Sequence, residues 1–243
     1  MEEKAQLARI SRETQQERVF RELSRGLLAG VFAPGEVISI RALCFQLGAG
    51  AMPVRESVQR LVGQGALEAL PNRTLRVPEM TADAFEELMR LRAALEPMAA
   101  GLAAESADAE DSSRFHALHI ALEQAVRGRH VGEALKLNTE LHFAIYRAAG
   151  APLLASIIEG LWLRLGPLLR VIFSSPDVLD SIFEQIWTKH SDLDRALAGR
   201  DAAGAQAALA QIIALTDRWF AHNHHFIEGE QPLSTRIARR KDQ

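Results

Sequence analysis

The stretch 52–77 constrains the fold of this chain more than any other segment. Pro53 suits the first turn of a helix, and Gly65 is well placed to end that helix. The short apolar segments 66–70 and 75–77 flank the turn sequence PNRT, so we expect them to form the two strands of a hairpin. A helix followed at once by a small hairpin with a basic tip is the outline of a winged helix-turn-helix.

The residues upstream of this stretch supply two further helices. Residues 14–29 carry apolar side chains at helical spacing, and Ser39 is a good N-cap for a short helix over residues 40–47. Gly and Pro residues separate the two segments and favour a turn between them. We therefore expect a DNA-binding domain of three helices and a β-hairpin wing within residues 1–78, followed by a linker at residues 79–81.

Charge and composition agree with an intracellular helical protein that contacts DNA through its first part. Residues 1–79 carry 11 Lys+Arg against 9 Asp+Glu, a net of +2, whereas the remainder carries 17 against 22, a net of −5. Glycine (16) and proline (9) are few, which disfavours an all-β fold. The one cysteine, Cys44, excludes an internal disulfide and is expected to be a small buried hydrophobe. A charged N-terminus and the interrupted apolar run 151–173 fit neither a signal peptide nor a membrane span, so we expect a cytoplasmic location with no membrane partner.

The rest of the chain predicts a helical bundle. Apolar side chains recur at helical spacing in six successive segments joined by short turns, which predicts a six- to seven-helix antiparallel bundle over residues 82–227. Residues 228–243 are expected to be a flexible basic tail. The fold class is therefore mainly α. The first helix of the bundle is expected to bury Phe85, Leu88, Leu95, Met98 and Leu102.

Five side chains of the winged helix are placed to contact DNA. Arg55 lies in the first turn of the third helix, where base contacts concentrate, and Gln59 lies one turn later on the same face. Arg41 lies early in the preceding helix, and Asn72 and Arg73 lie at the tip of the wing. Arginine neutralises phosphates and can bind a guanine edge through its planar fork. The alternative is that these arginines are ordinary solvated side chains.

Four polar side chains of the bundle fall on apolar stripes. Arg92 lies on the stripe of the first bundle helix, Asn138 and His142 share one face at i, i+4, and His190 lies on a stripe of a later helix. A polar group inside a helical core is costly without partners, so several of them from different helices indicate a polar cavity that binds a ligand. The alternative is that each is a core polar residue satisfied by its neighbours.

The remaining histidines are weaker candidates, and the tryptophans are expected to serve packing. His116 and His119 are expected to be half-exposed. Trp162 and Trp187 are expected to anchor the core or an interface. A cluster near the end of the last helix could bind metal adventitiously; it contains His222, His224 and His225.

The N-terminal region resembles the DNA-binding domain of GntR-type bacterial regulators. The resemblance is carried by PVRES, by QRLVGQGALEALPNR after it, and by GLLAGVFAPGEVISIRALCFQLG before it, over about residues 15–78. Many members have Ser-Arg shortly before the Pro-Val-Arg-Glu sequence, where this chain has Gly50 and Ala51, and the usual wing glycine is Thr74. An arginine commonly used by the family is therefore absent, and the operator cannot be transferred from relatives.

The helical region resembles the FCD ligand-binding domain of the FadR subfamily. The resemblance is carried by MRLRAALEPMAAGLAA, LNTELHFAIYRAAGAPLL and KHSDLDRALAGRDAAGA. It implies a divalent metal, Zn²⁺ or Ni²⁺, held at the positions of Asn138, His142 and His190, beside Arg92 and a carboxylate effector. The fourth family position is Ile212, which cannot bind a metal ion. Two alternatives therefore stay open for this region, an incomplete metal site and a polar pocket without a metal.

The resemblance implies a ligand-responsive bacterial transcription regulator and not an enzyme. Such a regulator is expected to be a homodimer on palindromic double-stranded operator DNA, most often a repressor that a small carboxylate effector releases. Two alternatives are a helical metalloenzyme and an interaction protein, in which the winged helix serves protein contacts. The sequence shows no HExxH motif, no Gly-rich phosphate loop and no nucleophile elbow, which disfavours the enzyme.

Overall fold

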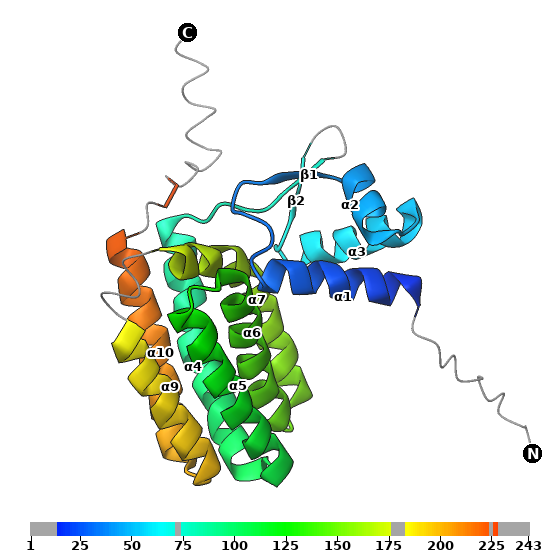
Figure 1. Cartoon of the computed structure of the whole chain (residues 1–243). Helices are drawn as coiled ribbons and strands as arrows, with labels where there is room; N and C mark the ends of the chain where they lie inside the picture. Colours follow the sequence, from blue (N-terminus) through cyan, green and yellow to red (C-terminus); the bar gives the residue numbers. More distant parts are fainter. Residues whose placement is uncertain (1–13, 71–73, 176–182, 224–225, 228–243) are drawn as a thin grey trace, which may run out of the picture.

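The protein is mainly helical, as the sequence predicts. The computed structural model describes residues 14–70, 74–175, 183–223 and 226–227. A small domain of three helices and a short sheet lies at one end of a bundle of longer helices (Figure 1). The predicted tail at residues 228–243 lies outside the described residues.

The N-terminal domain contains the three predicted helices, and local capping explains where they begin and end. Thr14 and Glu17 exchange the two hydrogen bonds of a capping box at the start of α1. The Ser39 hydroxyl accepts a hydrogen bond from Ala42 N at 3.1 Å and caps α2, which ends at Gly48 in the left-handed conformation. The helices are α1 (Gln15–Leu28), α2 (Ile40–Leu47) and α3 (Ala51–Gly63).

The wing contains one strand more than the sequence predicts. The expected hairpin is present as β2 (Glu68–Ala69) and β3 (Thr74–Arg76), and a third strand, β1 (Val37–Ser39), pairs antiparallel with β3. The order in the sheet is β1-β3-β2, and Ile38 lies opposite Leu75. Three residues are too few for an alternating pattern, so β1 exists because β3 offers it a partner.

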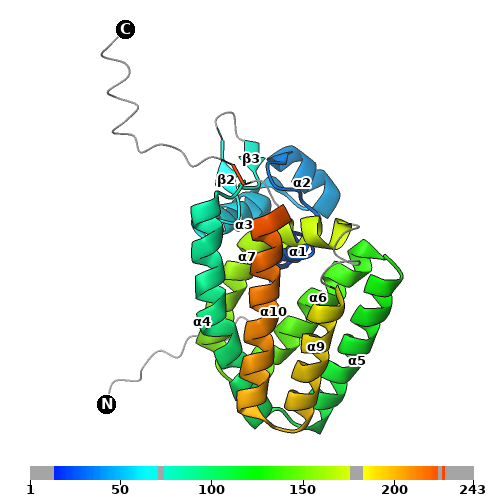
Figure 2. The ribbon, with the colours of Figure 1, turned by 90° about the vertical axis from the view of Figure 1, so that its left-hand side faces the viewer.

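Six helices of the described chain form the bundle (Figure 2). Helix α4 packs along α10 and α6, α10 also packs along α9, and α5 packs along α6. The helices are α4 (Ala82–Ser106), α5 (Ala109–Arg127), α6 (Val131–Ala148), α7 (Pro152–Ser174), α9 (Phe183–Ala198) and α10 (Ala202–Asn223).

The buried face of α4 is lined by smaller side chains than the sequence analysis predicts. Phe85 and Leu88 are buried as expected, but Met98 is 51% exposed and Leu102 is only partly buried. The reason is close packing against α10, which a run of small residues permits. These residues are Ala99, Ala100, Gly101, Ala103 and Ala104.

Helix α7 is a core helix of the bundle and also the support of the N-terminal domain. By length and composition alone it could cross a membrane, but it packs against α1, α4 and α6. Pro167 lies inside the helix without ending it. A Cβ added to Gly166 would collide with the Leu27 carbonyl oxygen, so glycine is required for the close approach of α1 to α7. Buried residues of both domains form one continuous core.

Candidate DNA interface and ligand cavity

Helix α3 presents one polar face to solvent and buries the other. Arg55 and Gln59, one turn apart, are exposed, and neither makes a hydrogen bond or ion pair with another described residue. Val54, Val58 and Leu61 are buried on the opposite face against the rest of the domain. The two polar side chains are therefore free to contact a partner in solution, as the helical spacing predicts.

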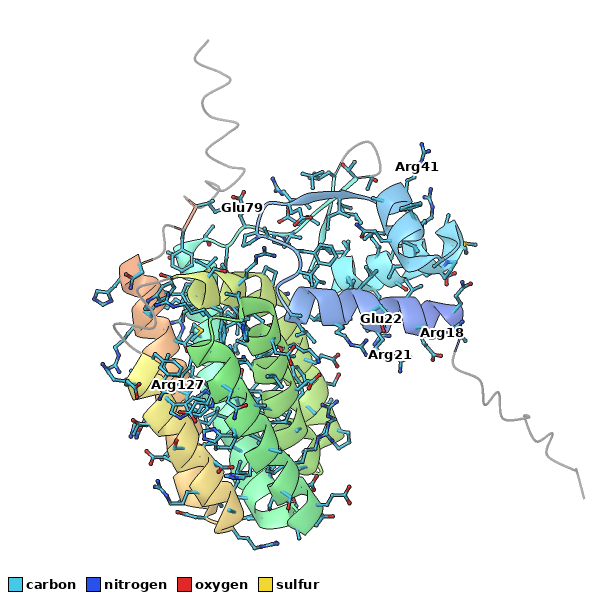
Figure 3. All side chains as sticks on the ribbon, in the orientation of Figure 1. Arg18, Arg21, Glu22, Arg41, Glu79 and Arg127 are labelled. Carbon is cyan, nitrogen blue, oxygen red and sulfur yellow. The ribbon has the colours of Figure 1, made fainter. Side chains whose placement is uncertain are left out.

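The other expected DNA contacts are placed only in part. Arg41 projects from the start of α2 away from the bundle (Figure 3). Asn72 and Arg73 lie outside the described residues. Two exposed apolar side chains of this domain were not predicted from the sequence, namely Phe45, which is 89% exposed, and Met52, which is 70% exposed. Met52 shares the face of Arg55, and its position in the first turn of α3 is the signal that could have singled it out, because apolar groups can contact thymine methyls.

A cavity of about 220 Å³, partly open to solvent beside Arg129 and His130, lies in the bundle among α4, α5, α6, α7, α9 and α10. All four predicted pocket residues line it, namely Arg92, Asn138, His142 and His190, and each is at most 7% exposed. Most of the wall is apolar and partly aromatic. This apolar wall includes Leu122, Leu169, Ile172, Phe173, Phe183, Trp162, Trp187 and Ile212.

Arg92 is not a free cation, because Glu96 neutralises it one turn along α4. Arg92 Nε donates to Glu96 Oε1 at 2.6 Å, and Nη2 donates to Oε2 at 3.1 Å. Glu96 is fully buried and also accepts hydrogen bonds from Tyr146 Oη at 2.7 Å and Trp162 Nε1 at 3.0 Å. Glu96 and Tyr146 were not predicted as site residues, although the i, i+4 spacing of Arg92 and Glu96 is a recognisable signal.

This network fixes the tautomer of His142. The only proton of the Tyr146 hydroxyl goes to Glu96, so the contact of 3.0 Å between Tyr146 Oη and His142 Nδ1 requires that Nδ1 carry the proton. The Nε2 atom then holds a lone pair. Burial, followed by His190 and Arg92, holds the pKa of His142 well below its ordinary value, so the ring is uncharged at neutral pH.

His190 belongs to an aromatic stack. The ring centres of His190 and Trp187 lie 5.8 Å apart. Trp187 also stacks on His119, with the ring centres 4.2 Å apart. Burial, and then His119, lowers the pKa of His190 to about 3, and its Nδ1 atom has no hydrogen-bond partner among the described residues.

The expectation for His119 is wrong and that for His116 is nearly met. His119 is only 5% exposed, because it lies one turn from Phe115 and Leu122 on the buried face of α5. The His116 side chain is 65% exposed and its Nδ1 lies 2.8 Å from Asp194. His222 is exposed, and the other two members of its predicted cluster lie outside the described residues.

The cavity does not offer a full set of metal ligands. No group of three or more His, Cys, Asp or Glu side chains in the described part of the chain is arranged to hold a metal ion. His142 and His190 lie edge to face with their ring centres 5.6 Å apart, and Asn138 adds one amide. Ile212 occupies the wall at the fourth family position. Two imidazoles and an amide are a poor set for Zn²⁺ or Ni²⁺, so these residues do not fit the metal that the resemblance implies.

The helices that line the cavity also hold the N-terminal domain. On α6, next to the cavity residue Asn138, Thr139 Oγ1 lies 3.2 Å from the Leu28 carbonyl oxygen and shares its one proton between that oxygen and the Leu135 carbonyl oxygen of its own helix at 3.0 Å. On α7, Arg170 Nη1 donates to the Gly30 carbonyl at 3.1 Å, next to the cavity residue Leu169. Arg164, also on α7, donates to the Gln64 carbonyl beyond α3 at 3.1 Å.

Two family models match the chain in the order of these two regions. Residues 15–77 match the model described as bacterial regulatory proteins, gntR family, and residues 87–215 match the FCD domain. The HTH-type transcriptional regulator McbR of Escherichia coli K12 is 32% identical over 192 residues, which are 79% of this chain and 86% of that protein. The Nta operon transcriptional regulator of Aminobacter aminovorans is 34% identical over 115 residues, which are 47% of this chain and 54% of that one.

Solved structures show the same architecture. The structure described as E. coli McbR/YncC matches with a TM-score of 0.81 at 28% identity and covers 88% of this chain and 100% of that one. A putative GntR transcriptional regulator from Rhodococcus sp. RHA1 matches with a TM-score of 0.69 at 18% identity, over 88% of this chain and 100% of that one, and shares the fold.

Proposed function

Because the chain belongs to the GntR family and is a DNA-binding transcription regulator, not an enzyme, we propose that it is a cytoplasmic, ligand-responsive repressor of the FadR subfamily. Its targets are palindromic operators, and a small effector in the bundle cavity releases it from them. The single observation that carries the proposal is that α6 and α7 line the cavity and also hold the winged helix.

On the DNA side, Arg55 and Gln59 contact base edges in the major groove, and Arg41 contacts the backbone. Support comes from their exposure and from the absence of hydrogen bonds and ion pairs to other described residues. Asn72 and Arg73 contact DNA from the wing by their position in the sequence. Arginine suits these roles because one fork can bind guanine O6 and N7 together.

On the ligand side, the effector enters the cavity beside Arg92, Asn138, His142 and His190. The end of α1 contacts Thr139 of α6 and packs closely against Gly166 of α7. A ligand that changes the spacing of α6 and α7 therefore changes the position of α1. Its differential affinity for the two arrangements is what shifts the regulator off its operator. The carboxylate effector expected from the resemblance stays a prediction. The pairing of Arg92 with Glu96 favours an effector that is not a carboxylate.

The protein acts as a homodimer through α4 and α7. These neighbouring helices expose apolar side chains at helical spacing, with Leu91 45%, Met98 51%, Leu153 75% and Ile157 46% exposed. An exposed apolar stripe is costly in a monomer and suits a two-fold contact with a second copy. Two copies would present two winged helices to the half-sites of a palindrome.

The DNA-binding proposal is tested by selection from a pool of random duplexes, followed by titration of the selected site at two salt concentrations. We expect a palindromic site whose affinity falls steeply with salt. Arg55→Ala should weaken binding by about tenfold or more, which corresponds to loss of one bidentate base contact. Arg195→Ala, an exposed arginine of α9 in the bundle, is the matched control and should bind as wild type does. Failure to enrich any sequence would contradict the proposal.

A further inference from the structure

We propose that the cavity binds an uncharged ligand without a metal ion. The ligand is a small, largely apolar ring system that carries a hydroxyl group, and the hydroxyl donates a hydrogen bond to His142 Nε2. That this ligand is the effector rests on the proposed function. That the cavity binds a ligand of this class rests on the contacts around Arg92 and His142.

The inner wall of the cavity carries no net charge. The guanidinium of Arg92 and the carboxylate of Glu96 form a bidentate pair that sums to zero, and the Arg92 side chain is 5% exposed. A carboxylate placed beside this pair would give up its hydration and would also face the negative charge of Glu96. A buried anion without a free cation is strongly disfavoured, so the inner wall selects against carboxylates.

His142 presents a hydrogen-bond acceptor to the cavity. Its Nδ1–H is committed to Tyr146, which in turn donates to Glu96, and this relay leaves Nε2 as an acceptor. Nε2 makes no hydrogen bond with the described residues, while the His142 side chain is 97% buried and lines the cavity. An acceptor in that position requires a donor from the ligand, and a hydroxyl supplies one without bringing charge.

The remaining wall of the cavity is aliphatic and aromatic. Ile212 places an aliphatic side chain where a fourth ligand would be needed, and Trp162 and Trp187 add two aromatic surfaces. About 220 Å³ holds one or two rings and no more. Such a wall stabilises an apolar body by burial, and the polar group sets its orientation.

Charged groups near the cavity do not change this selectivity. Arg129 and His130 line the cavity only at the end of α5 and the start of α6, and both are exposed to solvent. An ion pair formed there by a ligand carboxylate would remain hydrated and would contribute little to affinity. Asn138 is neutral and can serve a ligand of either polarity, whereas Thr216 donates its hydroxyl proton to the Ile212 carbonyl at 3.0 Å and offers the cavity an acceptor.

Three probes of equal ring size separate the possibilities when calorimetry is used with the full chain at pH 7.5: 2-naphthol, naphthalene and 2-naphthoate. We expect 2-naphthol to bind about tenfold more tightly than naphthalene, which is the value of one buried neutral hydrogen bond. We expect 2-naphthoate to bind at least tenfold more weakly than 2-naphthol. The order should be the same with EDTA and with added Zn²⁺.

Two variants make the test specific. In His142→Phe, naphthalene should bind as in wild type, which shows that the cavity is intact, and the advantage of 2-naphthol should disappear. Asn138→Ala should retain a part of that advantage, because the proposed acceptor is still present. Tightest binding by 2-naphthoate, dependence of binding on Zn²⁺, or no binding of any probe would overturn the proposal.

Operator binding measured on the same samples separates this inference from the proposed function. If the protein binds its selected DNA site but prefers 2-naphthoate or binds no probe, the ligand class is wrong and the regulator stands. If the probes bind in the predicted order but no DNA sequence is selected, the cavity assignment stands and the proposed repressor function fails.

Discussion

Replacing Glu96 with glutamine tests the arrangement on which the ligand selectivity depends. The Glu96→Gln side chain has almost the same volume but no charge, so Arg92 becomes a buried cation without a counter-ion. Glu96 itself is 0% exposed, and it accepts two hydrogen bonds from Arg92, one from Tyr146 and one from Trp162.

The expected loss of unfolding free energy is about 3–5 kcal/mol, the usual consequence of removing one member of a buried ion pair. The double variant Arg92→Met, Glu96→Gln should be more stable than Glu96→Gln alone, because it no longer buries an unpaired charge. It should still be less stable than wild type, since the donors of Tyr146 and Trp162 lose their carboxylate, at about 1–3 kcal/mol for each unsatisfied group.

Urea unfolding followed by circular dichroism at pH 7.5 measures the three free energies at one protein concentration. The single variant Glu96→Gln should also gain affinity for an anion. We expect 2-naphthoate to bind to Glu96→Gln at least tenfold more tightly than to the wild type. An unfolding free energy of Glu96→Gln within about 0.5 kcal/mol of wild type, the usual range for a surface position, together with an unchanged 2-naphthoate affinity, would refute this role of Glu96.

The buried histidines, Gly166 and the exposed Leu153 can each be tested by substitution. The pKa values of His142 and His190 are lowered in the folded protein, so the unfolded chain takes up protons first as the pH falls. The stability that is present above pH 6.5 is therefore lost as the pH falls toward 3. Between pH 6.5 and 5.5 the free energy of unfolding should fall by about 2 kcal/mol, and urea titrations of His190→Phe should show half of that loss. Gly166→Val should separate α1 from α7 and weaken the effect of ligand on operator binding. Gly132→Ala is the control, because a Cβ at Gly132 meets open space, and it should leave that effect unchanged. Equal behaviour of the two variants would contradict the claim that α7 connects the cavity to α1. Leu153→Glu should convert the dimer to a monomer in light scattering, and an unchanged mass would place the interface elsewhere.

Much of the fold can be predicted from the sequence because its signals are local. Ser39 caps a helix through its own hydroxyl, and Gly48 ends that helix in the left-handed conformation. Helical spacing also predicts that Arg92, His142 and His190 point inward, and they are buried. Such features depend on residues a few positions apart.

The parts that could not be predicted depend on contacts between distant segments. Strand β1 forms because β3 pairs with it, and Tyr146 and Trp162 reach Glu96 only because α6 and α7 pack against α4. The pairing of Glu96 with Arg92 is local, and its i, i+4 spacing was a usable signal. Cys44 is only partly buried, since α2 packs through Leu43. His119 is a different case, because its spacing from Phe115 and Leu122 was a usable signal for burial.

The most direct test of the account is the operator affinity of the full chain with and without a ligand in the cavity. Titration of the selected DNA site at saturating 2-naphthol should give a Kd at least fivefold higher than without it, the lower end of ordinary allosteric coupling. His142→Phe should show the same Kd at that 2-naphthol concentration as without it. Equal operator affinity of the wild type with the cavity filled and empty would contradict the claim that α6 and α7 connect the cavity to the DNA-binding domain.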